Sequence, residues 1–274
     1  MELWPLMLVR LASLTGERVS FHGLGSRRGA LAATTVAYGG AALFLWGASA
    51  AAGHLAWIGA AFWPGAVYAV SFALYTAALT EGAVGEVSGF ANTTVLLLFI
   101  VQPRWDLWSL VGMTFFLAGS LLLVPPGQKL SRPVLWMVLS GVAVVVGRLM
   151  DQKALTPVSL PYAASLFTSV LLWLAVPVSA YGLWRSAGRL AVERPVWSVS
   201  SAGFNALSYW TVLELLRLIS PGLVEAVSAL AGVGATAVGV VMFKEGRAVP
   251  KVLAAVLMTT ATLMLLFSQH GSMG

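Results

Sequence analysis

The sequence predicts an all-α integral membrane protein of about ten transmembrane helices, built as two inverted five-helix repeats. Three observations predict this fold class. The 274 residues are 59% hydrophobic and only 9% charged, whereas soluble domains carry about 25% charged residues. Apolar segments of spanning length recur along the whole chain, and both halves show the same order of segments and breaks. This composition argues against a soluble enzyme, a disordered chain and a protein that reads nucleic-acid grooves.

Clusters of glycine, proline and charge divide the first half into apolar segments, each able to cross about 30 Å of hydrocarbon as a helix. We expect these helices over residues 3–22, 30–50, 57–79, 83–102 and 106–124. The first segment is unusual because it carries Arg10, Glu17 and Arg18. It either spans the membrane or lies at its surface, and the second arrangement would leave nine spanning helices.

The second half divides in the same way, with helices expected over residues 133–152, 161–183, 196–217, 222–243 and 249–268. Pro221 can open the fourth of these, since the first turn of a helix tolerates proline. We expect the longest connection, residues 184–195, to be a loop. Tryptophans near the segment ends fit the aromatic belts of a membrane protein, namely Trp57, Trp105, Trp108, Trp136, Trp184 and Trp197. The segments lack the period-two alternation of a membrane β-barrel.

The two halves, residues 1–127 and 128–274, are expected to be structural repeats. Residues 87–91 read VSGFA, and residues 227–231, at an offset of 140, read VSALA. Earlier in the chain an offset of 131 matches Gly16 with Gly147. Because each half crosses the membrane an odd number of times, the second half enters from the opposite side. Inverted repeats of this kind are common in secondary transporters, whose substrate site lies between the halves near the midplane.

The last third of the chain has a recognisable plan. A helix end is followed by the turn Ser220-Pro221-Gly222, a long apolar helix, the loop Lys244-Glu245-Gly246 and a final apolar helix. This plan resembles the EamA-type repeat of the drug/metabolite transporter superfamily. Residues 75–124 follow it more loosely. The resemblance implies a transporter of two such repeats, with the fourth helix of each half lining a central site and both termini inside the cell.

Lysine and arginine outnumber aspartate and glutamate by 16 to 10. In a membrane protein this excess points to loops that face anionic lipid, and nucleic acid need not be invoked. Most basic residues share one side of the expected topology: Arg18, Arg27, Arg28, Lys129, Arg132, Arg185, Arg189, Arg194, Lys244, Arg247 and Lys251. By the positive-inside rule this side is cytoplasmic, which places both termini outside, opposite to what the resemblance implies.

Two glutamates, Glu86 and Glu225, occupy nearly equivalent places in the repeats, in the first turns of their helices. A charge at the centre of a span costs about 2.5–3.5 kcal/mol or more, so both are candidates for charge recognition or proton coupling. The alternative is that each stabilises a helix N-terminus, where the helix dipole favours negative charge. Two further pairs have the i,i+3 spacing of simple ion pairs at helix ends, namely Glu214 with Arg217 and Arg148 with Asp151.

Polar side chains form stripes on the helices expected to face the centre of the bundle. The predicted substrate-binding residues are Tyr68, Ser71, Tyr75, Ser88, Asn92, Ser201, Asn205, Ser208, Tyr209 and Trp210. Polar groups in hydrocarbon need partners, so these stripes are expected to face protein or water. They could line an aromatic-walled cavity with a few hydrogen-bonding groups, or they could only bond neighbouring helices to one another.

The sequence therefore predicts a secondary active transporter of a small polar or amphipathic metabolite, working by alternating access, in which Glu86 or Glu225 supplies charge recognition or proton coupling. We expect a multi-pass location in the bacterial inner membrane. The expected partners are the small-molecule substrate, the lipid bilayer and a second copy of the chain. The chain has no cysteine and three scattered histidines, so we expect no metal, no cofactor and no enzyme activity. The alternatives are a flippase for a lipid-linked headgroup, a membrane enzyme and a non-transporting scaffold subunit.

Overall fold

The structure, a computed structural model, describes residues 3–25, 29–102, 106–123, 131–154, 158–242, 244 and 248–270. Within these ranges all regular structure is helical. The elements are α1 (Leu3–Gly25), α2 (Ala30–Ala51), the short 3-10 helix η1 (Gly59–Ala61), α3 (Phe62–Glu81), α4 (Val84–Phe90), α5 (Thr93–Val101), α6 (Leu107–Leu123), α7 (Arg132–Ala154), α8 (Ser159–Ala180), α9 (Trp184–Glu193), α10 (Pro195–Leu216), α11 (Pro221–Met242) and α12 (Ala248–His270).

Several of these helices can cross a membrane by their length and composition. Five long apolar helices in the described chain meet both conditions, namely Ala30–Ala51, Gly59–Glu81, Arg132–Ala154, Ser159–Ala180 and Pro221–Met242. Shorter apolar helices cover Val87–Val101, Leu107–Leu122 and Val249–Leu265. The chain is therefore a multi-pass α-helical membrane protein, as its composition predicts.

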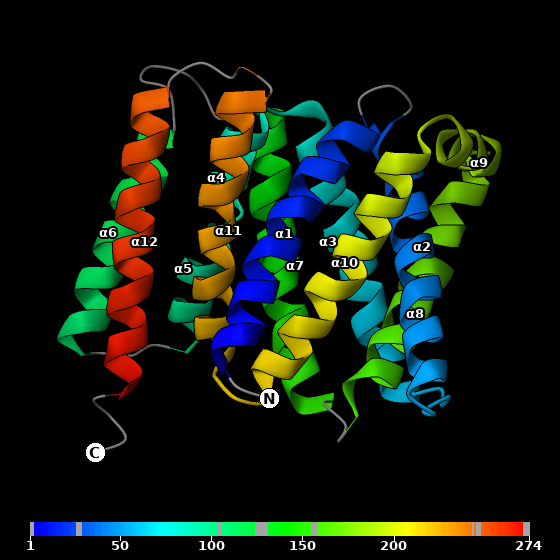
Figure 1. Ribbon diagram of the computed structural model, residues 1–274, viewed down its shortest axis with the longest axis horizontal. Helices are drawn as coiled ribbons and strands as arrows, with labels where there is room; N and C mark the ends of the chain where they lie inside the picture. The colour runs from blue at the N-terminus through cyan, green and yellow to red at the C-terminus, as the bar shows by residue number, and fades with distance from the viewer. Residues whose placement is uncertain are drawn as a thin grey trace.

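The helices stand side by side in one bundle and run alternately up and down (Figure 1). At the left side of the bundle in this view α6 packs on α12, and α2, α8 and α9 lie at the right side. The beginning of α1 and the end of α12 share the lower edge of the bundle in this view. Between these two sides α1 packs on α10, α3 and α11, and α7 packs on α3. Side chains from these five helices therefore meet at the centre.

The first helix lies inside the bundle, although its charges allowed a place at the membrane surface. Arg10, Glu17 and Arg18 are each at most 6% exposed. Gly16 makes a close approach to α10 possible, since an added Cβ would lie 2.8 Å from the ring of Phe204. The charged side chains of α1 thus face protein, and the alternative of a surface helix does not fit this packing.

The single helix expected over 83–102 is wrong, because α4 and α5 are separated at Ala91 and Asn92. At this interruption the backbone amides of Asn92 and Thr94 bond carbonyl oxygens three residues earlier, at 3.2 and 3.4 Å. The hydroxyls of Thr93 and Thr94 donate to carbonyl oxygens at the same spacing. Side chains that bond nearby backbone compete with the regular helix ladder, so hydropathy alone does not reveal such a break.

The loop expected over 184–195 is also wrong, because these residues form α9 and the start of α10. Ala187 and Leu190 are buried on one face of α9, while Arg185 and Arg189 are exposed on another. Isolated helices of this length are marginal in water. Packing of the apolar face against α2 supplies the missing stabilisation.

Candidate functional site

The centre of the bundle contains a cavity of about 80 Å³. Residues from α1, α2, α3, α5, α7, α10 and α11 line it, so both halves of the chain contribute. A buried water needs about 10–15 Å³ of such space, so the cavity has room for a few waters. Five lining side chains are charged, and each is at most 8% exposed: Arg10, Glu17, Arg18, Arg148 and Glu225.

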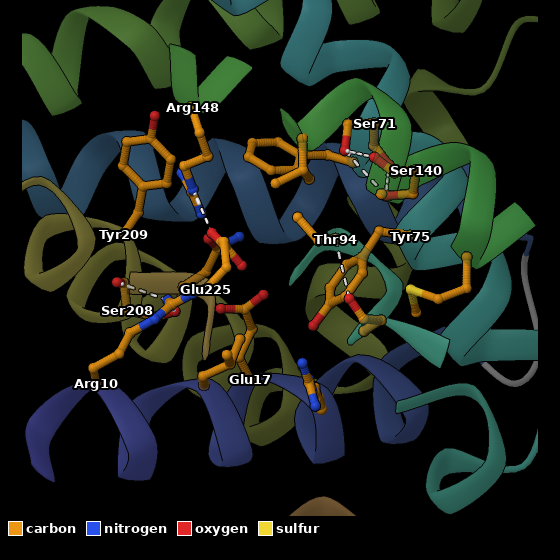
Figure 2. A pocket seen from close by; sticks show the side chains of 18 of the residues that line it. Arg10, Glu17, Ser71, Tyr75, Thr94, Ser140, Arg148, Ser208, Tyr209 and Glu225 are labelled. Atoms are coloured by element: carbon orange, nitrogen blue, oxygen red, sulfur yellow. Dashed lines mark hydrogen bonds and ion pairs between the residues drawn. The ribbon is translucent and has the colours of Figure 1, made fainter. Parts of the chain in front are cut away.

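Arg148 of α7 links two carboxylates at one wall of this cavity. Its Nε donates to Oε1 of Glu225 on α11 at 2.6 Å, and its Nη1 lies 3.5 Å from Oδ2 of Asp151. Nη1 also donates to the Tyr68 hydroxyl at 3.0 Å. Figure 2 shows the Arg148 and Glu225 side chains pointing toward one another across the cavity wall. Arg148 therefore holds α7 and α11 together through a buried, charge-assisted contact.

Asp151 is fully buried beside Arg148 and accepts three tyrosine hydroxyls. Tyr68 of α3 donates to Oδ2 at 2.6 Å, Tyr209 of α10 donates to Oδ2 at 2.6 Å, and Tyr162 of α8 donates to Oδ1 at 2.8 Å. The Arg148 guanidinium also lies over the rings of Tyr68 and Tyr209, at 5.7 and 5.4 Å from the ring centroids. One carboxylate thus connects helices α3, α7, α8 and α10, and Arg148 neutralises its charge.

Arg10 of α1 lies near the same wall, but its hydrogen-bond acceptors are neutral. Its Nε donates to the Ser228 hydroxyl at 2.9 Å, and its Nη1 donates to the carbonyl oxygen of Ser208 at 2.9 Å and to the Ser208 hydroxyl. These contacts join α1 to α10 and α11. The nearby charges of Glu225 and Glu17 balance the guanidinium without direct ion pairs.

Glu17 and Arg18 differ from Arg148 and Glu225 because neither forms an ion pair with a described residue. Within the described chain Glu17 forms no ion pair within 4.0 Å, and the charges that act on it come from Arg10 and Arg18. Arg18 donates Nη1 to the carbonyl oxygen of Ser88 at 3.4 Å, and its Nε has no partner there. The Tyr75 hydroxyl and the Asn205 Nδ2 are likewise buried without partners in the described chain. A polar ligand in the cavity could satisfy these atoms.

The structure brings six predicted site residues together around the cavity: Ser71, Tyr75, Asn205, Ser208, Tyr209 and Glu225. Tyr68 lies directly behind the wall, bonded to Asp151. Glu86 belongs to α4, but its side chain lies outside the part of the chain that the structure describes.

Four other predicted site residues do not line the cavity. Ser88 lies within α4, and Asn92 lies at the interruption between α4 and α5, where its Nδ2 contacts Sδ of Met258 at 3.0 Å. The Ser201 hydroxyl donates to the carbonyl oxygen of Ser198 at 3.0 Å. Trp210 Nε1 donates to the Ser159 hydroxyl at 3.1 Å. The bonds of Asn92 and Trp210 join neighbouring helices, whereas Ser201 bonds within its own helix.

Sequence reasoning did not assign Arg18, Arg148 or Asp151 to this site. The i,i+3 spacing of Arg148 and Asp151 predicts an ion pair at a helix end, and the pair exists but is buried. A signal for the charged residues was present, since ionisable groups within apolar segments are costly and usually functional. The offset of 131 that matches Gly16 with Gly147 also matches Glu17 with Arg148, two charges of opposite sign that both reach the cavity.

The comparisons with known proteins bear on the fold. No protein-family model and no curated protein matches this chain. Among solved structures 24 chains match. One of them, described only as the crystal structure of a protein, has a TM-score of 0.64 and 14% sequence identity. The match covers 96% of this chain and 98% of that chain. The two proteins share a fold over their whole length, and a shared fold does not by itself establish a shared function.

Proposed function

We propose that this protein is a secondary active transporter of a small polar or amphipathic metabolite in the bacterial inner membrane, working by alternating access. One observation carries the proposal. A cavity lined by buried charged side chains of both signs lies at the centre of a multi-pass membrane protein. Buried charges are expensive in a membrane protein and usually mark substrate or ion pathways. A central polar cavity can hold a solute between the two faces of the bilayer.

The packing of the helices supports two inverted repeats. We match α1, α2, α3, α4–α5 and α6 with α7, α8, α10, α11 and α12. The main contacts then occur in equivalent pairs, because α1 packs on α10 as α7 packs on α3, and α2 packs on α10 as α8 packs on α3. The matched glycines Gly16 and Gly147 each lie against an aromatic ring of the other half, Phe204 and Tyr68 respectively. Halves related in this way can rock about the central site to open it to either face in turn.

Within this mechanism Glu17 and Arg18 bind charged groups of the substrate, while Tyr75 and Asn205 form hydrogen bonds to it. All four reach the cavity. Arg18, Tyr75 and Asn205 each have a buried polar atom without a partner in the described chain, and Glu17 forms no ion pair there. Glu225, by contrast, is already bound to Arg148 at 2.6 Å. Glu17 is therefore a better candidate for substrate or proton binding than Glu225, which acts in the contact between α7 and α11.

Counterflow in proteoliposomes tests the transport function. Vesicles are preloaded with pools of amino acids, nucleosides, sugars or organic cations, and uptake of the matching labelled tracer is followed. We expect the wild-type protein to accumulate one tracer. Glu17→Gln is expected to reduce this uptake about tenfold or more, since a hydrogen bond to a charged group contributes about 1.5–3 kcal/mol.

Glu214→Gln provides the matched control, because Glu214 pairs with Arg217 at a helix end and lies outside the cavity. This variant should transport at the wild-type rate. If folded protein accumulated no tracer from any pool, the result would contradict the transporter proposal and favour a lipid substrate or a scaffold role. Equal transport by Glu17→Gln and the wild type would remove Glu17 from the mechanism.

We also propose that the upper edge of the bundle in Figure 1, where α9 lies, faces the cytoplasm. The helix α9, which carries Arg185 and Arg189, and the beginning of α7, which carries Arg132, lie at this edge, whereas α7 and α10 end at the lower edge, near Lys153 and Arg217 (Figure 1). The positive-inside rule assigns the more basic end to the cytoplasm. Both ends of the chain would then face outward.

The absence of natural cysteines makes this orientation easy to test. Single cysteines are introduced as Tyr181→Cys in the turn before α9 and Ala52→Cys after α2, both at exposed positions. In intact cells a membrane-impermeant maleimide should label Ala52→Cys and spare Tyr181→Cys until the cells are permeabilised. The reverse pattern would place both ends of the chain inside the cell, as the family resemblance implies.

A further inference from the structure

The helix α9 has the features of a helix that lies at the level of the lipid headgroups. It follows α8 after a turn in which Gly182 has φ 63, a conformation that favours glycine. Ala187 and Leu190 are buried and Arg185 is exposed, so the helix is amphipathic. Trp184 opens it and donates Nε1 to the Ser179 hydroxyl at 2.9 Å. Amphipathic helices and tryptophans of this kind lie at the level of the lipid headgroups.

A large apolar groove extends along α2 beside this helix. It has a volume of about 1110 Å³ and is bounded by α2, α9 and α10. Its lining runs along α2 from Thr35 to Ala51, which corresponds to about 24 Å at 1.5 Å per residue. Half of the hydrocarbon core measures about 15 Å. The groove is therefore long enough for a lipid acyl chain.

Small residues keep the groove open. Gly47 of α2 and Gly188 of α9 line it, and a Cβ added to either would meet no atom within 4 Å. Exposed apolar side chains, including Leu43 at 75% and Phe44 at 48%, complete the walls. No residue of the described chain covers this surface, which suits a flexible hydrocarbon chain.

Two arginines supply the charge that selects the headgroup. Arg185 directly follows the lining residue Trp184, and Arg189 directly follows the lining residue Gly188. Both side chains are exposed, and their spacing of four residues places them on one face of α9. Guanidinium groups bind phosphate oxygens through paired charge-assisted hydrogen bonds. An apolar groove next to a pair of arginines at headgroup level is complementary to an anionic phospholipid, which has acyl chains and a negatively charged phosphate.

We propose that the groove between α2, α9 and α10 binds one anionic phospholipid, with an acyl chain along α2 and the phosphate at Arg185 and Arg189. The bound lipid would cover an outer face of the bundle, separate from the central cavity, because the two share no lining residue. The site does not depend on the transport function, and its test does not use transport.

Native mass spectrometry of the purified protein tests this site. The protein is incubated with equal amounts of phosphatidylglycerol and phosphatidylcholine of the same acyl composition, and the lipid retained per protein is counted. The wild type should retain one phosphatidylglycerol in about tenfold preference to phosphatidylcholine. The double variant Arg185→Gln/Arg189→Gln should bind both lipids equally. Gly47→Phe should lose both lipids, because the new ring occupies the open space.

Two variants serve as matched controls on other faces. Arg132→Gln removes an exposed arginine that lies over Trp136, with 4.5 Å between its Cζ and the ring centroid. Val241→Phe enlarges an exposed residue in the groove between α11 and α12. Both should retain phosphatidylglycerol as the wild type does. Unchanged retention in the Arg185→Gln/Arg189→Gln and Gly47→Phe variants, or the same loss in the controls, would overturn the proposal.

Discussion

Asp151→Ala is expected to lower the free energy of unfolding by about 3–5 kcal/mol, because it breaks a buried ionic network by removing one member. Tyr162 and Tyr209 would each lose the carboxylate oxygen that accepts their hydroxyl at 2.8 and 2.6 Å. Arg148 would keep Glu225 but lose its second carboxylate, which lies 3.5 Å away. Buried polar groups left without partners cost more than the bonds they formed.

Reversible unfolding in mixed detergent micelles, followed by circular dichroism, measures this loss. Glu81→Ala, at an exposed position at the end of α3, should change stability by no more than about 0.5 kcal/mol. The loss of stability in Tyr162→Phe should lie between those of Asp151→Ala and Glu81→Ala, since this variant removes one of the three tyrosine donors to Asp151. If Asp151→Ala were no more harmful than Glu81→Ala, the tyrosine network would not be a stabilising element.

Arg148→Met is expected to abolish the proposed transport and to destabilise the fold by about 3–5 kcal/mol, because Glu225 and Asp151 would remain buried without their counter-ion. The loss of transport follows from breaking the link between α7 and α11, whose Nε–Oε1 distance is 2.6 Å. Adding Glu225→Gln removes one of the two uncompensated charges. The double variant Arg148→Met/Glu225→Gln should therefore recover about 1–3 kcal/mol of stability while transport stays absent.

A double-mutant cycle that combines these variants with Glu225→Gln alone measures the coupling between the two residues. The pair Arg217 and Glu214 supplies the control cycle, since its side chains are 28% and 16% exposed and its N–O distance is 3.3 Å. A partly exposed pair of this kind is worth about 0.2–1 kcal/mol. If the stability losses of Arg148→Met and Glu225→Gln simply added in the double variant, this would contradict a direct buried contact between the two residues. Retained transport in the double variant would show that the link does not contribute to the transport cycle.

The membrane location could be predicted from the sequence because hydropathy depends on composition within a segment. The apolar segments beginning near residues 30, 133 and 222 correspond closely to α2, α7 and α11. The interruption between α4 and α5 could not be predicted in the same way. It depends on local bonds of Thr93 and Thr94 to the backbone, which leave the hydropathy of the segment unchanged.

The site was harder to predict because it depends on how each helix is rotated about its axis. Tyr75 and Asn205 were predicted from polar stripes and do reach the cavity. Trp210 follows Tyr209 in the chain, yet only Tyr209 reaches the cavity, since successive helical residues point about 100° apart. Asp151 was expected in a simple pair, but it has three tyrosine partners on three other helices. Tyr162 lies 11 positions away on the next helix, whereas Tyr209 and Tyr68 are 58 and 83 positions away.

The sequence by itself determined that this chain is helical, apolar and embedded in a membrane with several crossings, because these properties follow from the composition of each segment. It also marked Arg10 and Glu17 as unusual charges within an apolar segment, whereas Arg148 was expected only in a simple ion pair at a helix end. Only the tertiary structure decided which of them meet. Arg148 bonds Glu225 across 77 positions of sequence, while Glu17 is left facing the cavity. The physical reason is that the partner of a buried charge is set by the packing of helices against one another, which no single segment encodes.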